Sequence, residues 1–179
     1  MSYVRQASTR QRRIIQSPQR GNSLEKLLKN MAQSLSQIYI HFIFHVKETT
    51  IKRNHLGELW HYIAGIARAQ NSLVVRVGGE PDHIHMLCTL PRQMSLSDFA
   101  EEIKRSSSKW IKTKDSCYRA FAWQRGYAAF SVSQSRLEET EAYIDNQEEH
   151  HKKISFREEY LKWLQAYGVE YDEKYVLSD

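Results

Sequence analysis

Two histidines separated by a single residue, His83 and His85, are the pair of side chains best suited to chemistry in this sequence. They fall in an alternating segment typical of a β-strand, where side chains two positions apart point to the same face, about 6.5–7 Å apart along the strand. Both imidazoles could then bind one divalent ion and leave open positions for a substrate. An H-x-H pair also occurs without function, so the assignment depends on its surroundings.

A tyrosine and a glutamine, Tyr143 and Gln147, are four residues apart in a segment expected to be helical. That spacing places them on the same face of a helix. Tyrosine is a recognised covalent nucleophile, and a carboxamide oxygen is a competent ligand for Mg²⁺ or Mn²⁺. One helix could therefore present both an attacking oxygen and a metal ligand. The structural alternative is that Tyr143 anchors the helix to the sheet while Gln147 faces solvent.

The hydrophobic pattern predicts the elements that must position these residues. Residues 36–47 alternate strictly and predict a long strand, in which His41 and His45 share one face and are expected to pack or form hydrogen bonds rather than bind metal. Further strands are expected at 72–78, 83–90 and 127–133, and helices at 53–70, 95–113, 136–153 and 156–167.

Capping and turn residues suggest where some of these elements end. Asn54 is expected to cap the first helix and Ser95 or Ser97 the second, while Gly78-Gly79 is expected to turn the chain. The order β-α-β-β-α-β followed by helices is the split β-α-β pattern of ferredoxin-like folds. We therefore predict an α+β fold, with an antiparallel sheet, helices on one face, and C-terminal helices that carry the tyrosine.

Charge is distributed unevenly along the chain, whose net charge is +5. Residues 1–30 carry a net +6 and lack apolar periodicity, which predicts a disordered tail. The stretch 104–136 carries a net +7 and the stretch 137–179 a net −7. The basic stretch could lie along a phosphate chain, or the two could simply form a solvated surface. The expected organisation is a tail (1–30), a main domain (31–154) and a helical extension (155–179).

Two classes of protein are disfavoured by what the sequence lacks. No run approaches the roughly 18 apolar residues of a membrane span, and the first thirty residues lack the apolar core of a secretory signal. Cys88 and Cys117 show no C-x-x-C spacing, so reduced thiols in a cytoplasm are expected, with Cys88 buried.

Four segments give the chain a family resemblance. In this order and spacing, and over roughly residues 36–150, they resemble the HUH single-tyrosine transposases of small bacterial insertion sequences. The segments are EPDHIHMLCTLP (80–91), IKRSSSKWIK (103–112), WQRGYAAFSVS (123–133) and YIDNQ (143–147).

The resemblance implies a role for each of four residues. His83 and His85 match the paired metal-binding histidines, Gln147 matches the third ligand, and Tyr143 matches the nucleophile. It implies cleavage and rejoining of single-stranded DNA at hairpin-marked element ends through a 5′-phosphotyrosine, with Mg²⁺ or Mn²⁺, by a homodimer whose subunits share active sites. A sister group associated with repetitive palindromes tends to have Asn-Pro where this chain has Asn146-Gln147, which favours an insertion-sequence enzyme.

Residues that could contact DNA or support the site are less specific. Asp82 or Glu80 could orient an imidazole, and His150 and His151 are expected at the surface. Candidate phosphate contacts are Lys104, Arg105, Lys109, Lys112 and Arg125, and candidate base-stacking residues are Trp123 and Tyr127. The alternative for the aromatic residues, Trp110 included, is a place in the core.

Two other functions compete with an active transposase. A domesticated relative would bind hairpins or single-stranded DNA without cutting, and a ferredoxin-like metal-binding protein or small hydrolase would show no preference for single strands. The presence of both histidines, the tyrosine and the glutamine together favours the active enzyme.

Overall fold

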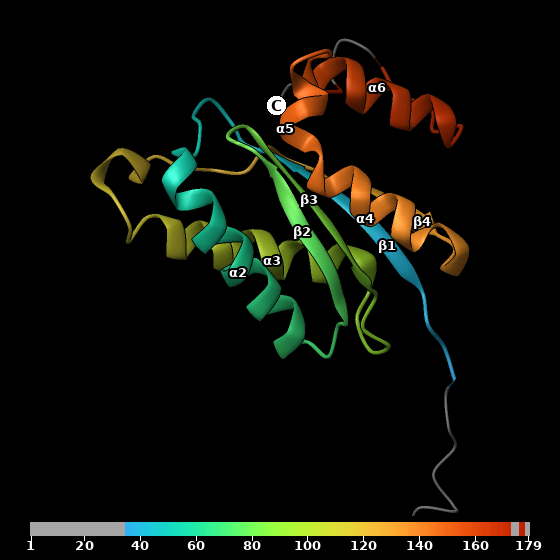
Figure 1. Ribbon diagram of the computed structural model, residues 1–179. Coiled ribbons are helices and arrows are strands. Elements are labelled where there is room, and N and C mark those ends of the chain that lie inside the picture. The colour runs from blue at the N-terminus through green and yellow to red at the C-terminus, as the bar shows by residue number, and fades with distance from the viewer. Residues whose placement is uncertain (1–34, 173–175, 178–179) are drawn as a thin grey trace, which may run out of the picture. The chain divides into compact units, whose positions relative to one another are not determined.

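The computed structural model describes residues 35–172 and 176–177 of the chain (Figure 1). The predicted tail, residues 1–30, lies outside the described residues. None of the helices in the described part combines the length and apolar character needed to cross a membrane. The elements, in chain order, are β1 (Tyr39–His45), α2 (Arg53–Ala69), β2 (Val74–Glu80), β3 (His83–Thr89), α3 (Leu96–Ile111), η1 (Ser116–Tyr118), β4 (Ala128–Val132), η2 (Gln134–Arg136), α4 (Leu137–Asp145), α5 (Gln147–His151) and α6 (Phe156–Ala166).

The four strands form one antiparallel sheet in the order β2-β3-β1-β4. The long alternating strand β1 is central, as predicted, and its register places Ile43 opposite His85 and His45 opposite His83. This strand order and the β-α-β-β-α-β succession confirm the predicted ferredoxin-like α+β fold.

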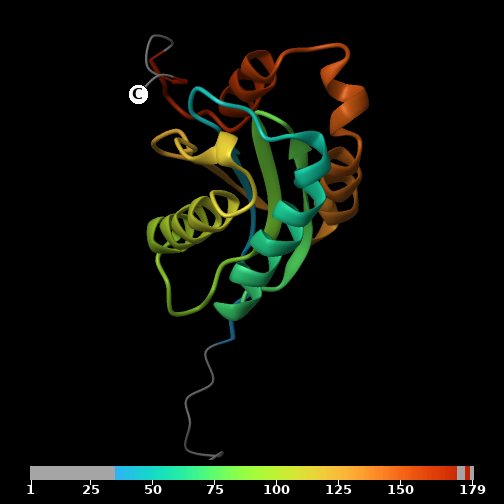
Figure 2. The ribbon, with the colours of Figure 1, turned by 90° about the vertical axis from the view of Figure 1, so that its left-hand side faces the viewer.

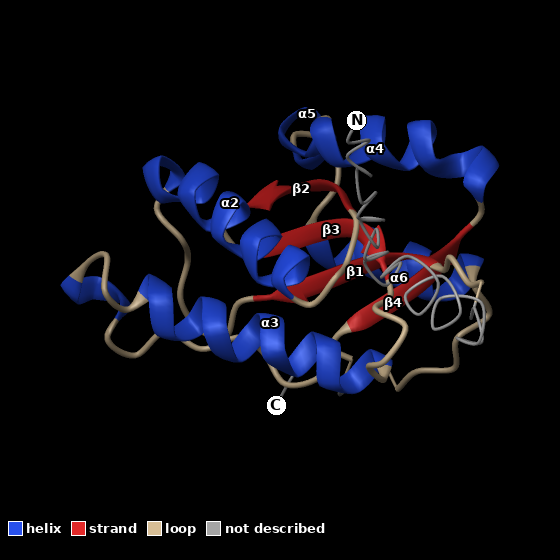
Figure 3. Ribbon diagram, turned by 90° about the horizontal axis from the view of Figure 1, so that it is seen from below, coloured by secondary structure: helices blue, strands red, loops and turns tan. Residues whose placement is uncertain are grey.

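One face of the sheet forms the main core. Alternate residues of the central strands, such as Phe42 in β1 and Met86 in β3, are fully buried there against α2 and α3. Leu59 of α2 and Phe99 of α3 belong to the same cluster. Figure 3 shows α2 and α3 together on this side of the sheet.

The opposite face of the sheet is covered by the C-terminal helices. Ile43 packs with Phe156 and Leu164 of α6, and Leu87 packs with Ile144 of α4. Figures 2 and 3 show α4 and α5 on the side of the sheet away from α3. Because strand side chains alternate between faces, the odd-numbered residues of β3, His83 and His85 among them, point into this second layer.

Three element boundaries differ from the sequence predictions. Helix α2 begins after Lys52, so Asn54 lies inside its first turn and does not cap it. The prediction for α3 is confirmed, because Ser95 caps this helix and its Oγ accepts a hydrogen bond from Asp98 N. Strand β2 continues through Gly78-Gly79 to Glu80, because these two residues pair with β3. The turn therefore follows at residues 81–82 rather than at the glycines.

The third difference is an interruption of the helix predicted at 136–153. Asn146 separates α4 from α5, with φ −94° and ψ 16°. The hydrogen bonds from Asn146 N to Ala142 O and from His150 N to Asn146 O carry the chain across this residue. Tyr143 and Gln147 consequently belong to two consecutive helices rather than one.

Gly78 allows α4 to pack directly on β2, and its replacement is expected to destabilise the protein. A Cβ at Gly78 would lie 2.8 Å from Ile144 Cγ2 and 3.1 Å from Ile144 O, whereas a Cβ at Gly57 would meet nothing within 4 Å. We expect Gly78→Ala to lower the free energy of unfolding by about 1–3 kcal/mol. The control Gly57→Ala, within α2, should leave it unchanged or raise it by up to about 1 kcal/mol. Urea denaturation measures both, and equal effects of the two substitutions would contradict this packing.

Candidate active site

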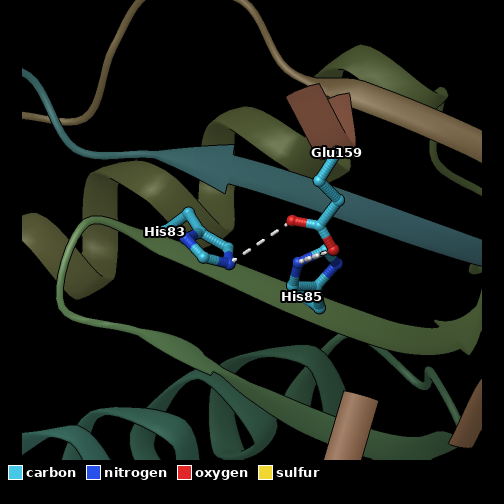
Figure 4. Close-up of side chains that lie close together, drawn as sticks. All are labelled: His83, His85 and Glu159. Carbon is cyan, nitrogen blue, oxygen red and sulfur yellow. Dashed lines mark ion pairs between the residues drawn. The ribbon is translucent and has the colours of Figure 1, made fainter. Parts of the chain in front are cut away.

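The two histidines predicted from sequence lie side by side on β3 with fully buried side chains. His83 Nδ1 is 2.7 Å from Asp82 Oδ1, and His85 Nδ1 is 2.8 Å from His41 Nε2. Each ring therefore has one nitrogen engaged by a neighbour and its Nε2 directed toward α6 (Figure 4). Such contacts fix the orientation of metal-binding imidazoles. Asp82 thus orients His83, as the sequence suggested, while His41 holds His85.

The carboxylate of Glu159, on α6, lies between the two imidazoles (Figure 4). Its side chain is 2% exposed; Oε1 is 3.6 Å from His85 Nε2 and Oε2 is 3.9 Å from His83 Nε2. One ligand atom from each of the three residues lies within 4.8 Å of the others, a grouping that could hold a metal ion. Glu159 was not among the site residues predicted from the sequence.

Tyr143 and Gln147 both reach the same carboxylate. The Tyr143 hydroxyl donates to Glu159 Oε1, and Gln147 Nε2 donates to that oxygen at 2.9 Å. Gln147 Oε1 is 3.0 Å from His83 Nε2. The structure therefore brings the four residues singled out in the sequence into one cluster within a single chain, although Asn146 separates the two helices that carry Tyr143 and Gln147.

The surroundings of this cluster correct two further predictions. His151 was expected at the surface, but its side chain is 14% exposed, and its Nε2 is 2.9 Å from Gln147 Oε1 and 3.0 Å from Glu159 Oε2. The chain turns back after α5, so the last residues of that helix face α6. Glu80 does not orient an imidazole and instead forms an ion pair with Arg53 at 2.8 Å. His150 is partly exposed beside the Tyr143 ring.

Burial sets the charge states in the cluster. It lowers the pKa of His85 to about 4, so that ring is neutral at physiological pH. Burial, together with the Glu159 carboxylate, raises the pKa of Tyr143, which therefore keeps its proton in this arrangement. Burial alone would raise the pKa of Glu159, but His85, Tyr143 and Gln147 hold it well below its ordinary value. The cluster therefore combines a neutral imidazole, a protonated phenol and an ionised carboxylate.

Tyr143 lies at the edge of the cluster, next to open space. It lines a hollow of about 260 Å³ with Glu159 and Trp163, and a second hollow of about 510 Å³ with Ser133 and Arg136. Trp163 Nε1 donates to the Tyr143 hydroxyl at 3.1 Å. A polymer could therefore approach the phenol from outside the protein core.

The donor atoms fit a divalent ion. Among the described residues, the buried His85 Nε2 has no hydrogen-bond partner. His83 Nε2 and Gln147 Oε1 are 3.0 Å apart. When a neutral His83 donates through Nδ1 to Asp82, its Nε2 carries a lone pair, so two acceptor atoms then face each other. A cation between them would be bound by both acceptors. Imidazole nitrogen with carboxamide and carboxylate oxygen is a ligand set suited to Mg²⁺ or Mn²⁺.

The residues predicted to contact phosphates lie on α3 or just before β4. Lys104 Nζ donates to the carbonyl oxygens of Gln124 and Gly126, and Arg105 is paired with Glu102, so both have structural contacts. Lys109, Lys112 and Arg125 are exposed. Helix α3 packs on the face of the sheet away from Tyr143, so its basic residues are not close to the cluster.

The predicted stacking role of Trp123 is wrong. This side chain is 8% exposed and lies in the main core, where its Nε1 donates to Ser107 Oγ at 3.0 Å. Val46 and Trp123 form a β-bridge, which fixes the indole inside the protein. Tyr127 is partly buried against the same core, with its ring 5.8 Å from that of Phe42. The Trp123 ring therefore offers no exposed face to a base, whereas stacking by Tyr127 stays a prediction.

The family model, the sequence relative and the solved structures that this chain resembles are all described as transposases. Residues 34–147 match the family model described as "Transposase IS200 like". The ISDra2 transposase TnpA of Deinococcus radiodurans is 27% identical over 101 residues, which cover 51% of this chain and 72% of that protein. A solved Deinococcus radiodurans R1 structure described as a transposase aligns with a TM-score of 0.51 at 20% identity, covering 66% of this chain and 96% of the other. The structure of a REP-associated tyrosine transposase bound to a REP hairpin aligns with a TM-score of 0.50 at 17% identity, covering 69% and 76%.

Proposed function

The chain belongs to the IS200-like transposase family, and from that membership we propose that it cleaves and rejoins single-stranded DNA through a covalent link to Tyr143. The observation that supports this most is the convergence of the Tyr143 hydroxyl, the Gln147 carboxamide and the His83 and His85 imidazoles around one carboxylate. A nucleophile beside a group of metal ligands is the arrangement that phosphodiester transfer needs.

The divalent ion would be held by His83, His85 and Gln147. When bound, it would supply positive charge to the scissile phosphate and to the departing oxygen. The Tyr143 oxygen attacks the phosphorus in line, the bond from phosphorus to the 3′ oxygen breaks, and that oxygen leaves as a 3′-hydroxyl after taking a proton. As the oxygen–phosphorus bond forms, the Tyr143 hydroxyl passes its proton along its hydrogen bond to Glu159 Oε1, and the departing 3′ oxygen takes its proton from water.

The covalent product is a 5′-phosphotyrosine. Because it conserves the energy of the phosphodiester bond, attack by a different 3′-hydroxyl reverses the step and joins a new strand without ATP. A hydrolytic nuclease would use water instead and would not require Tyr143.

The proposed substrate is single-stranded DNA with a hairpin, in the cytoplasm of the bacterial host. A structural relative is bound to a REP hairpin, which supports this choice. Lys109, Lys112 and Arg125 are exposed cations that could contact phosphates. The family resemblance implies a homodimer whose subunits share active sites. We propose the homodimer, but with Tyr143 acting beside the histidines of its own chain, because its hydroxyl contacts the same carboxylate as His85 within that chain.

Labelled hairpin oligonucleotides from the genomic flanks of the gene, incubated with the protein and Mn²⁺ or Mg²⁺, test this function on a denaturing gel. We expect a shifted band that survives denaturation, together with a released fragment ending in a 3′-hydroxyl. EDTA should remove both products. Hairpin binding that is indifferent to metal, without cleavage, would instead indicate a domesticated binding protein and contradict the proposal.

A further inference from the structure

We propose that Glu159 is a further protein ligand of the divalent ion, in addition to His83, His85 and Gln147. This inference rests on the metal site of the proposed function. Glu159 lies on α6, beyond residue 147, where the match to the family model ends. It would therefore be a ligand from outside the segment that the family model matches.

The spacing of the donor atoms supports direct binding. Octahedral Mg²⁺ with ligands at about 2.1 Å has neighbouring donors about 3 Å apart and opposite donors about 4 Å apart. The Glu159 carboxylate spans the two imidazoles, with Oε1 3.6 Å from His85 Nε2 and Oε2 3.9 Å from His83 Nε2. An ion among these atoms would require only small adjustments of side chains that already face one another (Figure 4).

The charge of the site supports the same assignment. Imidazoles and a carboxamide carry no formal charge when they bind metal, whereas hard divalent cations favour anionic oxygen. Among the described residues, Glu159 is the carboxylate in the group of potential ligands. Its side chain is 2% exposed, and a buried carboxylate is costly without a compensating charge.

The two carboxylate oxygens have different partners. Oε1 accepts hydrogen bonds from Tyr143 and Gln147. Oε2 is buried and accepts no hydrogen bond among the described residues, although His151 Nε2 lies 3.0 Å away as an ion-pair contact. Oε2, which is 3.9 Å from His83 Nε2, can therefore bind the ion without giving up a hydrogen bond, while Oε1 keeps its contact with Tyr143. Through this carboxylate the ion and the nucleophile are held at a fixed separation.

Mn²⁺ titration followed by electron paramagnetic resonance tests the proposal on the whole chain without relying on activity. Glu159→Gln keeps the size of the side chain and removes its charge, and we expect it to weaken Mn²⁺ binding by about tenfold or more. Glu170→Gln makes the same chemical change at an exposed position and should bind Mn²⁺ as the wild type does. Thermal unfolding shows whether each variant is folded.

The same titration separates this inference from the proposed function. If Glu159→Gln binds Mn²⁺ like the wild type while His83→Ala has lost binding, Glu159 is not a ligand but the proposed metal site stands. If His83→Ala also binds like the wild type, the metal site itself is wrong. Should Glu159→Gln fail to fold, a crystal of the wild-type protein grown with Mn²⁺ decides between the outcomes. An anomalous peak about 2.2 Å from a Glu159 oxygen supports the proposal. A peak bound to the histidines but more than about 3 Å from that carboxylate overturns it.

Discussion

Replacing Tyr143 with phenylalanine is expected to abolish the covalent protein–DNA adduct. The substitution removes only the oxygen that would bond to the 5′-phosphate, and loss of a catalytic nucleophile lowers the rate by at least about a thousandfold. Binding of the hairpin should change little, because the aromatic ring and the metal ligands remain. Adduct formation is measured on a denaturing gel with end-labelled oligonucleotide, and binding by fluorescence anisotropy.

One control variant and one stability measurement keep this result interpretable. Tyr62→Phe, on α2 at the other face of the sheet, should leave adduct formation unchanged. Tyr143→Phe also removes the hydroxyl that bonds to Glu159 and Trp163, so we expect a loss of about 1–2 kcal/mol in the free energy of unfolding, small enough for the variant to fold. Adduct at wild-type levels in Tyr143→Phe would exclude this residue as the nucleophile.

Replacing His83 with alanine is expected to remove metal-dependent cleavage. Its Nε2 faces Gln147 Oε1 at 3.0 Å and the Glu159 carboxylate at 3.9 Å, so the substitution deletes a donor from the centre of the site. Loss of a residue that merely orients a ligand costs about 10–100-fold in metal affinity or activity, and loss of a ligand should cost at least the upper end of that range. Cleavage rates across a Mn²⁺ titration measure the effect.

The matched control is His61→Ala, which removes an exposed histidine from α2. It should cleave at the wild-type rate over the whole titration. His83→Ala should still fold, although the empty space beside Asp82 and the Phe156 ring is expected to lower the free energy of unfolding by about 2–3 kcal/mol. Full cleavage by a folded His83→Ala variant would show that the imidazole pair does not hold the ion.

The sheet was predictable because strand alternation is a local property. The strict pattern of residues 36–47 identified the central strand, and the same two-residue period placed His83 and His85 on one face. Features set by tertiary contacts were not predictable. Gly78-Gly79 looks like a turn in sequence, but pairing with β3 keeps both residues in β2. Likewise, no local signal indicated that the helix predicted at 136–153 would break at Asn146.

In the candidate site, too, some residues were predicted from the sequence and one was not. The helical spacing of Tyr143 and Gln147 made them candidates and the family resemblance gave them their roles. The structure places both against the carboxylate between the histidines. Glu159 was missed because it follows the equally acidic Glu158 in an acidic C-terminal region. Glu158 caps α6 through Ser155, whereas Glu159 lies at the helical spacing of the buried Phe156. A carboxylate on the apolar face of an amphipathic helix was the available signal.

Tyr143 is the residue proposed to form the covalent bond to DNA. The tryptic peptide of residues 137–152 contains Tyr143 as its one tyrosine, so mass spectrometry of the digested adduct, after nuclease trimming, can locate the link. We predict that this peptide carries a 5′-phosphodeoxynucleotide on Tyr143. A nucleotide attached to a different peptide, or complete cleavage with a free 5′-phosphate and no modified peptide at any time, would contradict the account.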